Sequence, residues 1–371
     1  MDLKNNKVAT TETRSKSKSN VPVNKGHFDL DTPERINAFH EKLGKGWSEY
    51  QEYRNAWHYY PSNMIVRDYP ILVDLELASN CNLTCPMCYT TTDHFKLTVK
   101  RKLMKWELAK KVIDEVAGNA YALRLSWRGE STLNNKMIDV IRYAKEKGIR
   151  EVSFLTNGWK LHLDYFIELQ QAGIDWITVS FDGIEEEYNK IRKPLVYEET
   201  LDKLAKIKEY KIENDFDKPV IKVQGIWPSI RNNPEKFYNI LSNASDLVAF
   251  NPLIDYLGKD EKIVYENNFS CPQIYQRVFI SSTGESMMCN SDEYGDEIIG
   301  DANLQTVHDI WHGDKLNRIR NLHKESNGFM KVPICTKCYY PRKTEANETA
   351  QVNGRCIKIK NYINRKQSAG E

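Results

Sequence analysis

The feature that most constrains this chain is a set of three closely spaced cysteines directly after a short apolar run. The run at residues 71–77 has the length and composition of a buried β-strand. Cys81, Cys85 and Cys88 follow on one loop, and this spacing suits a metal cluster better than disulfides, which need particular Cα separations. Three thiolates hold three irons of a [4Fe–4S] cube, and no fourth cysteine lies nearby in the sequence. The spacing predicts a cluster whose fourth iron is open to a ligand.

The segment from residue 71 to Thr90 resembles the cluster loop of the radical S-adenosylmethionine (radical SAM) enzymes. Met87 stands where many members have an aromatic residue, and Tyr89 follows the third cysteine. The resemblance implies that SAM chelates the open iron through its amino and carboxylate groups. It also implies that an electron from the cluster cleaves the sulfonium C–S bond, and that the resulting 5′-deoxyadenosyl radical abstracts a hydrogen atom from substrate. The competing interpretation of the same cysteines is a zinc knuckle with a remote fourth ligand.

Composition limits the remaining classes of function. A formal net charge of +2 over 371 residues gives no general electrostatic reason to bind nucleic acid or an acidic membrane. No apolar run approaches the 18 residues of a membrane span, and the first residues lack the apolar core of a secretory signal. Eight cysteines without such a signal indicate a reducing compartment and metal or redox use. We therefore expect a cytoplasmic enzyme without nucleic-acid or membrane partners.

The chain is expected to begin with two segments outside the main domain. Residues 1–26 are polar and rich in lysine, and they are predicted to form a disordered tail. Residues 27–70 are rich in Tyr and Trp, and they are predicted to form a helical flap that packs on the main domain. Thr32, Pro33 and Glu34 form a typical helix start within this flap.

Six apolar runs alternate with helical patterns between residues 71 and 255, which indicates a parallel sheet with helical crossovers. Gly148 and Gly173 stand where two of these helices are expected to end. The radical SAM resemblance, which covers about residues 68–254, implies a partial (β/α)6 barrel of TIM type. The predicted strands are residues 71–77, 122–126, 151–155, 176–181, 220–226 and 247–251.

Polar motifs follow several of these strands, at the carboxyl edge where such sheets place their sites. Gly129 and Glu130 are similar to the end of the family's Gly-Gly-Glu motif, which holds the SAM amino group, and Arg128 replaces its first glycine. A carboxylate suits an ammonium group because ionised acceptors make the stronger hydrogen bonds. Thr156, Asn157 and Gly158 lie after the next strand, and Asn-Gly is also an ordinary turn pair.

Two further motifs point to SAM only through the resemblance. Ser180 and Asp182 belong to a Ser-Phe-Asp-Gly stretch that is similar to the family's Ser-x-Asp-Gly, near the SAM ribose and carboxylate. Arg192 matches a family arginine that can pair with the SAM carboxylate. Gln224, on the fifth predicted strand, is a weaker candidate for a contact with adenine.

Residues 256–345 contain a second set of cysteines. Cys271 and Cys289 stand at the outer ends of a predicted hairpin, and Cys335 and Cys338 close the segment. Four thiolates suit zinc or an iron–sulfur cluster. The stretch resembles the SPASM or shorter twitch extension of radical SAM enzymes, which implies one auxiliary [4Fe–4S] cluster. The alternative is structural zinc, on the four cysteines or on the last two with His308 and His312.

Residues 346–371 form a basic tail, which we expect to be a solvated helix or coil. Cys356 follows Gly354 and Arg355 within it, either as an ordinary thiol or as a hydrogen-atom donor to a substrate radical, which would make the protein an epimerase.

The resemblance implies a radical SAM enzyme that takes electrons from a donor such as flavodoxin or ferredoxin. We expect oxidation or epimerisation of a small hydroxylated substrate, such as a sugar or an aminocyclitol, because residues 1–70 contain no evident peptide-binding domain. Peptide or protein modification is the alternative within the family. A zinc-binding structural adaptor is the alternative of another class.

Overall fold

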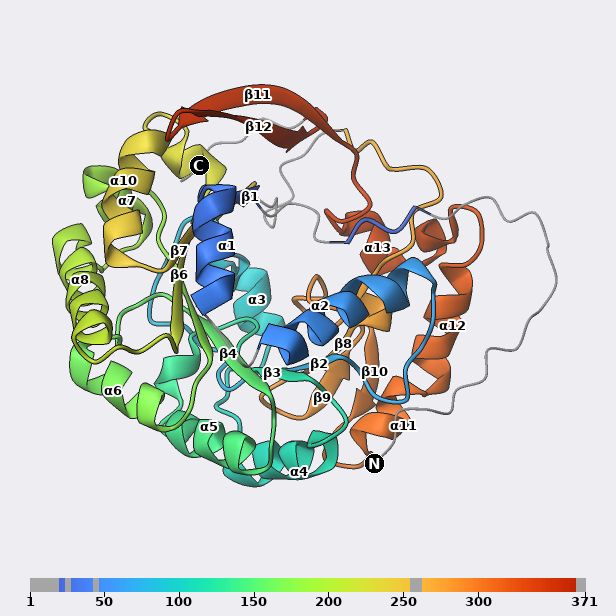
Figure 1. Ribbon diagram of the computed structural model, residues 1–371. Coiled ribbons are helices and arrows are strands. Elements are labelled where there is room, and N and C mark those ends of the chain that lie inside the picture. The colour runs from blue at the N-terminus through green and yellow to red at the C-terminus, as the bar shows by residue number, and fades with distance from the viewer. Residues whose placement is uncertain (1–19, 24–27, 43–46, 254–261, 365–371) are drawn as a thin grey trace.

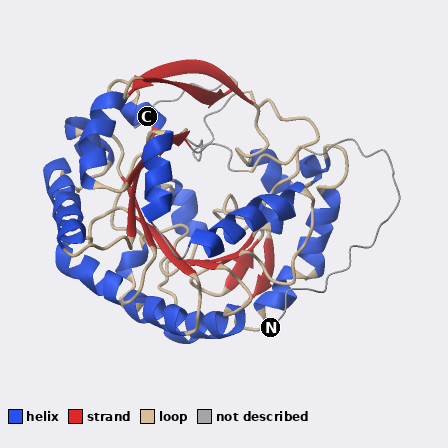
Figure 2. Ribbon diagram, in the orientation of Figure 1, coloured by secondary structure: helices blue, strands red, loops and turns tan. Residues whose placement is uncertain are grey.

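The central element of the fold is one curved sheet of ten strands, in the order β1-β7-β6-β5-β4-β3-β2-β8-β9-β10 (Figures 1 and 2). The computed structural model describes residues 20–23, 28–42, 47–253 and 262–364. Strands β2 to β8 pair in parallel along this order, whereas β1, β9 and β10 pair antiparallel. The strands are β1 Phe28–Asp29, β2 Leu72–Leu75, β3 Ala122–Arg124, β4 Glu151–Thr156, β5 Trp176–Ser180, β6 Val220–Ile226, β7 Leu247–Asn251, β8 Arg277–Ile280, β9 Glu285–Met287 and β10 Ile298–Asp301.

Helices alternate with the six strands from β2 to β7 and cover the outer face of the sheet, which confirms the predicted partial (β/α)6 barrel (Figure 1). The predicted bounds of the last two strands match β6 and β7. Gly148 and Gly173 have φ values of +86° and +90° just after α5 and α6, as expected of helix-ending glycines. The helices of this part are α3 Asp93–Thr98, α4 Trp106–Val116, α5 Met137–Glu146, α6 Leu163–Gln171, α7 Glu185–Ile191, α8 Tyr197–Glu213, α9 Trp227–Ile230 and α10 Pro234–Ala244.

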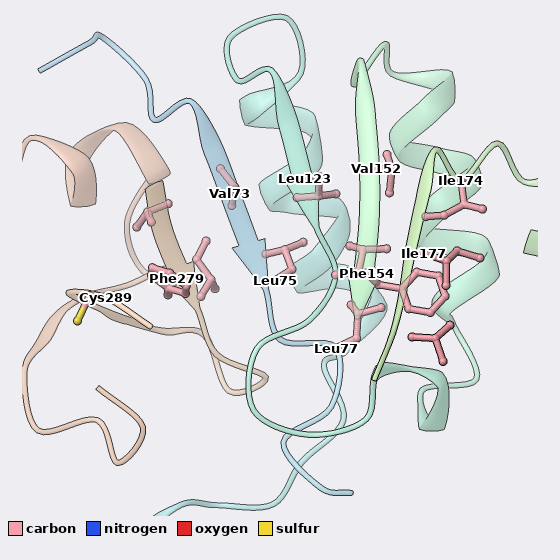
Figure 3. Packing of buried hydrophobic residues seen from close by; sticks show 14 of the residues in the cluster. Val73, Leu75, Leu77, Leu123, Val152, Phe154, Ile174, Ile177, Phe279 and Cys289 are labelled. Atoms are coloured by element: carbon pink, nitrogen blue, oxygen red, sulfur yellow. The ribbon is translucent and has the colours of Figure 1, made fainter. Parts of the chain in front are cut away.

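The two faces of the barrel strands differ in polarity. One face carries fully buried apolar side chains that pack beneath the helices, among them Val73, Leu123 and Val152 (Figure 3). The other face turns polar side chains such as Thr178 and Lys222 toward the interior of the barrel. Because successive strand residues point to opposite faces, one alternating pattern builds both the core and a polar interior.

The predicted flap consists of α1 Pro33–Lys42 and α2 Trp47–Ser62. Thr32 accepts a hydrogen bond from the backbone of Arg35, which confirms the predicted helix start. Tyr53 and Trp57 of α2 pack on Leu72 at the start of β2, so the flap covers the amino ends of the strands, opposite the cysteine loop. Of the predicted disordered tail, Asn20 pairs with Phe269, so the prediction of disorder is wrong there; residues 1–19 and 24–26 lie outside the described residues.

The second cysteine segment extends the barrel sheet. The predicted hairpin is confirmed as β8 and β9, and β8 pairs in parallel with β2. Three helices follow it: α11 Val307–Trp311, α12 Asp314–Leu322 and α13 Pro333–Lys337. Within the described residues, no helix has the length and apolar content that a membrane span needs.

The prediction of a solvated helix or coil at the C-terminus is wrong. Strands β11 Thr344–Val352 and β12 Arg355–Tyr362 form a separate antiparallel hairpin, which arches between α10 and α13 (Figure 1). Asn353 and Gly354 have φ values of +51° and +70° at its turn. Asn-Gly is the strongest short hairpin signal, because both positions need a positive φ.

Candidate active site and cluster centres

The three cysteines of the first loop lie at the carboxyl end of β2. The amide of Cys88 donates to the carbonyl of Cys85 at 3.0 Å, which closes the loop into a turn. Burial raises the pKa of Cys85 to about 11. All three cysteines are free thiols. The loop therefore fits a cluster with three protein ligands and one open iron.

Gly129 lies directly against this cysteine loop. A Cβ at position 129 would lie 2.3 Å from the carbonyl oxygen of Asn80 and 2.5 Å from that of Ala78. The amide of Glu130 donates to the same Asn80 carbonyl at 2.8 Å. Only glycine therefore allows the loop after β3 to approach the cysteine loop this closely.

Glu130 is buried and ties the ends of β3 and β4 together. Its Oε1 accepts hydrogen bonds from the hydroxyls of Thr132 at 2.6 Å and Thr156 at 2.8 Å, and its Oε2 accepts one from the amide of Asn157 at 2.8 Å. A carboxylate has about four acceptor positions, so Oε2 retains capacity for a further donor. The predicted contact with the SAM amino group remains a proposal, beside this structural role.

Asn157 is more than the turn residue that its sequence context suggests. Its side-chain amide donates to Oδ1 of Asn82 at 2.9 Å and lies 3.8 Å from the sulfur of Cys81. Thr156 and Asn157 thus connect β4 to both Glu130 and the cysteine loop. The sequence signal that could have identified them is their position directly after a predicted strand. The other site motifs occupy the same position after their own strands.

Arg192 and Asp182 form an ion pair beside the cluster loop. Nη2 of Arg192 lies 2.5 Å from Oδ2 of Asp182, and its Nη1 lies 3.8 Å from the sulfur of Cys85. Burial acts to lower the pKa of Arg192, but the charges of Asp182 and Cys85 outweigh it and raise the pKa. The predicted contact of Arg192 with the SAM carboxylate stays a prediction, and in this structure Arg192 pairs with Asp182. Ser180 is half-buried on β5, in register with Gln224 of β6.

The arginine that replaces the first glycine of the motif has a structural partner. Arg128 makes a two-pronged ion pair with the buried Glu76 at 2.5 and 2.7 Å, and it donates to the carbonyl of Glu293 at 3.2 Å. Glu76 follows β2, and Glu293 follows β9. Arg128 therefore joins the barrel to the second cysteine segment.

The four cysteines of that segment converge on one buried centre. Cys271 precedes β8, Cys289 follows β9, Cys335 lies in α13 and Cys338 ends that helix. Burial raises the pKa of all four thiols, that of Cys271 to about 12. The charges of other cysteines in the set raise the pKa of Cys271, Cys289 and Cys335 further.

The spacing of these sulfurs favours a cluster over a single zinc ion. Tetrahedral zinc with Zn–S bonds of about 2.3 Å keeps its sulfurs within about 3.8 Å of one another. In the described chain, no three cysteine sulfurs lie within 4.8 Å of one another. A larger iron–sulfur cube accommodates such a separation, so these residues fit an auxiliary cluster.

The alternative zinc set of two cysteines with His308 and His312 is wrong. Both imidazoles instead contact Asp68, just before β2: Nε2 of His308 lies 3.1 Å from Oδ1 of Asp68, and Nε2 of His312 lies 2.8 Å from its carbonyl oxygen. These polar groups satisfy one another and attach α11 to the barrel. The histidine beside the auxiliary cysteines is His323, which the sequence did not single out.

A cavity of about 590 Å³ occupies the barrel interior. Its walls include Thr178 of β5 and Lys222 and Gln224 of β6, and α2 contributes to its lining. Asn290 and Tyr339 also line it, and these two residues directly follow Cys289 and Cys338. The polar interior therefore reaches the polypeptide that carries the second cluster.

Cys356 does not face this cavity. It alternates with Lys358 and Lys360 on the exposed face of β12, whereas Ile357 and Ile359 pack toward the protein. The structure offers no geometric support for Cys356 as a hydrogen-atom donor, and that role stays a prediction.

Comparison with known proteins identifies the class. A profile of the radical SAM superfamily matches residues 75–240, and one of the SPASM iron–sulfur cluster-binding domain matches residues 271–339. The chain belongs to the radical SAM superfamily. Within it, the chain is a member of the branch that carries a SPASM domain, and its cofactors are SAM, a catalytic [4Fe–4S] cluster and an auxiliary [4Fe–4S] cluster.

Individual relatives are distant. The chain is 26% identical over 234 residues to a 7,8-dihydro-6-hydroxymethylpterin dimethyltransferase of Methanocaldococcus jannaschii, covering 58% of this chain and 42% of that protein. It is 29% identical over 134 residues to an Fe-coproporphyrin III synthase of Methanosarcina barkeri, covering 36% and 33%. The matched part is thus less than half the length of either relative. BtrN in complex with AdoMet and 2-DOIA shares the fold, with a TM-score of 0.50, 19% identity, and coverage of 72% of this chain and 92% of that one.

Proposed function

We propose that the protein oxidises a small hydroxylated molecule, such as a sugar or an aminocyclitol, with the auxiliary cluster as electron acceptor. The observation that carries this proposal is the interior cavity, whose wall includes Asn290 and Tyr339, the residues next to two auxiliary cysteines. Oxidation of CH–OH to C=O removes one hydrogen atom, one proton and one electron. The three must leave by separate routes, so an electron acceptor beside the substrate suits oxidation. Epimerisation would instead need a hydrogen-atom donor, and Cys356 faces away from the cavity.

The lining of the cavity suits a hydroxylated substrate. Gln224 and Asn251 offer amide groups, and Thr178 offers a hydroxyl. Such groups can donate and accept hydrogen bonds, so they match the hydroxyls of a neutral polyol. Tyr339 and Tyr340 add aromatic surface to the same wall. The relatives named above are also named for small molecules, a pterin and a porphyrin.

Lys222 is the residue that we propose to take the hydroxyl proton. Burial lowers its pKa to about 8, so a minor but useful fraction of the amine is neutral near physiological pH and can act as a base. Lys222 pairs with Thr178 of β5 and lies two residues before Gln224, on the same face of β6. When bound, SAM and the clusters supply the radical and carry the electron. The protein binds the substrate, orients it and holds the proton at Nζ of Lys222.

The test is anaerobic reconstitution with SAM and a reduced flavodoxin or ferredoxin, followed by incubation with sugars and aminocyclitols deuterated at single carbons. We expect deuterium in 5′-deoxyadenosine and a carbonyl product from one of them. Replacing Cys335 and Cys338 by Ala should abolish the carbonyl product and leave SAM cleavage intact. Full product formation by this variant would overturn the electron-acceptor role. Turnover of peptides alone would favour the alternative, peptide modification.

A further inference from the structure

The imidazole of His323 lies between two of the four auxiliary cysteines. His323 follows α12, and its side chain is almost completely buried. The backbone amide of Cys271 donates to its Nδ1 at 3.1 Å, and its Nε2 lies 3.5 Å from the sulfur of Cys335.

These two contacts fix where the imidazole proton lies. A backbone N–H can only donate, so Nδ1 of His323 must be the unprotonated acceptor. In a neutral imidazole the proton then lies on Nε2, and the N–H group points at the sulfur of Cys335. The amide of Cys271 thus selects the tautomer that donates to Cys335.

We infer that His323 is a positioning residue for the auxiliary cluster: through its N–H···S hydrogen bond to Cys335 it raises the reduction potential of that cluster. Hydrogen bonds to ligand sulfurs tune the potential of iron–sulfur clusters, because a donor stabilises the additional negative charge of the reduced state. A higher potential makes the cluster a better acceptor for the electron of a substrate radical. The inference rests on the auxiliary cluster of the proposed function and is independent of the substrate.

His323 is also a donor that mutation can remove. The amide of Tyr340 lies 3.3 Å from the sulfur of Cys338, but a backbone donor cannot be deleted by changing a side chain. The imidazole can be replaced by two amides that each keep one of its contacts. The His323→Asn side chain has an acceptor near the position of Nδ1 and leaves Cys335 without this donor. The His323→Gln side chain places an N–H near the position of Nε2.

The experiment is an EPR-monitored redox titration of the full-length chain, with Cys81, Cys85 and Cys88 replaced by Ala so that only the auxiliary cluster is observed. We expect His323→Asn to lower the midpoint potential and His323→Gln to keep it close to that of the parent. Equal potentials in all three proteins would overturn the inference. Loss of cluster iron in His323→Asn would also overturn it, since His323 would then be needed for assembly.

A second readout separates this inference from the proposed function. With the catalytic cysteines intact, both variants should cleave SAM at the parent rate, and this step does not report on the auxiliary cluster. A changed potential without any sugar oxidation would support the role of His323 and count against the proposed substrate class. An unchanged potential with normal sugar oxidation would overturn the role of His323 and support the proposed substrate class.

Discussion

At the scale of single residues, Arg128 shows why one position departs from the family motif. The glycine usually found there lets the backbone approach a ligand, whereas the side chain of Arg128 connects the barrel to the second cysteine segment. Its guanidinium neutralises Glu76, which is completely buried, and Glu76 also accepts from the amide of Ser282 at 2.9 Å. A bidentate Arg–carboxylate pair has a geometry that Lys cannot reproduce.

We predict that Arg128→Met destabilises the protein by about 3–5 kcal/mol, because it leaves the carboxylate of Glu76 buried without its partner. The measurement is chemical unfolding followed by circular dichroism under anaerobic conditions. Arg142→Met is the matched control, since Arg142 forms an exposed ion pair with Asp139 at 3.6 Å, and such pairs contribute about 0–1 kcal/mol. Equal stability of the two variants would show that the buried pair contributes nothing.

Lys222 gives the proposed oxidation a pH dependence. Burial lowers the pKa of its ammonium to about 8, so the neutral amine that accepts a proton becomes dominant above pH 8. The rate of carbonyl formation should therefore rise with pH through about pH 8. In Lys222→Met this rise should disappear and the rate should fall by about 10²–10⁴, the usual contribution of a general base. The SAM-cleavage rate of the same variant is the control, and a pH profile identical to that of the parent would exclude Lys222 as the base.

Sequence identified the site residues unevenly, for a physical reason. The spacing of Cys81, Cys85 and Cys88 within one loop indicates a metal centre, and this spacing is a local property of the sequence. The role of Asn157 depends on Glu130 and Asn82 being brought together by neighbouring strands, which no local pattern records. His323 was missed for the same reason, because its partners Cys271 and Cys335 lie 52 and 12 residues away and no local spacing links the three.

At the scale of elements, the C-terminal hairpin completes the wall of the interior cavity. Tyr362 of β12 lines the cavity. Arg355 donates to the carbonyls of Leu30 and Asp31 at 2.7 and 2.9 Å, and Glu348 accepts from the indole N–H of Trp227 at 2.8 Å. The hairpin is thus fixed to the barrel from both of its strands.

We predict that ending the chain before Thr344 leaves both clusters in place but raises KM for substrate about tenfold, equal to about 1.4 kcal/mol of binding free energy. Both cysteine sets precede this position, whereas Tyr362 leaves the cavity wall. Iron content and substrate kinetics check the two parts. A chain ending at Asn364 is the control, since it retains β11 and β12, and an unchanged KM in the shorter chain would show that substrate does not touch the hairpin.

The elements themselves were predictable where the pattern was strong. Strand β6 alternates apolar and polar residues, β7 is an almost continuous apolar run, and the predicted bounds of both were exact. The hairpin β11–β12 was missed because β11 carries few apolar residues, so the Asn353-Gly354 turn was its clearest signal. The pairing of β8 with β2 could not be read from either segment, because register depends on contacts between distant strands.

At the scale of the whole molecule, one continuous sheet unites the barrel with the auxiliary segment. Asp74 of β2 is completely buried and lies between Arg124 of β3 and Arg277 of β8. Its distances to Arg124 Nε and to Arg277 Nε and Nη2 are 2.5–2.7 Å. This network joins three adjacent strands, two from the barrel and one from the auxiliary segment, at the centre of the sheet.

We predict that the two modules unfold together and that Asp74→Asn lowers the temperature of this joint transition. The substitution removes the charge that compensates the buried guanidinium of Arg277 and the half-buried one of Arg124, and breaking a buried pair costs about 3–5 kcal/mol. Ellipticity reports on the barrel and visible absorbance on the clusters, and the two should be lost at one temperature in both proteins. Asp202→Asn is the control, because Asp202 forms an exposed pair with Lys206 at 2.7 Å. If the cluster absorbance of the Asp74→Asn protein disappeared well below the loss of ellipticity, the auxiliary segment would be an independent unit, and the continuity of the sheet would not couple the two cluster sites.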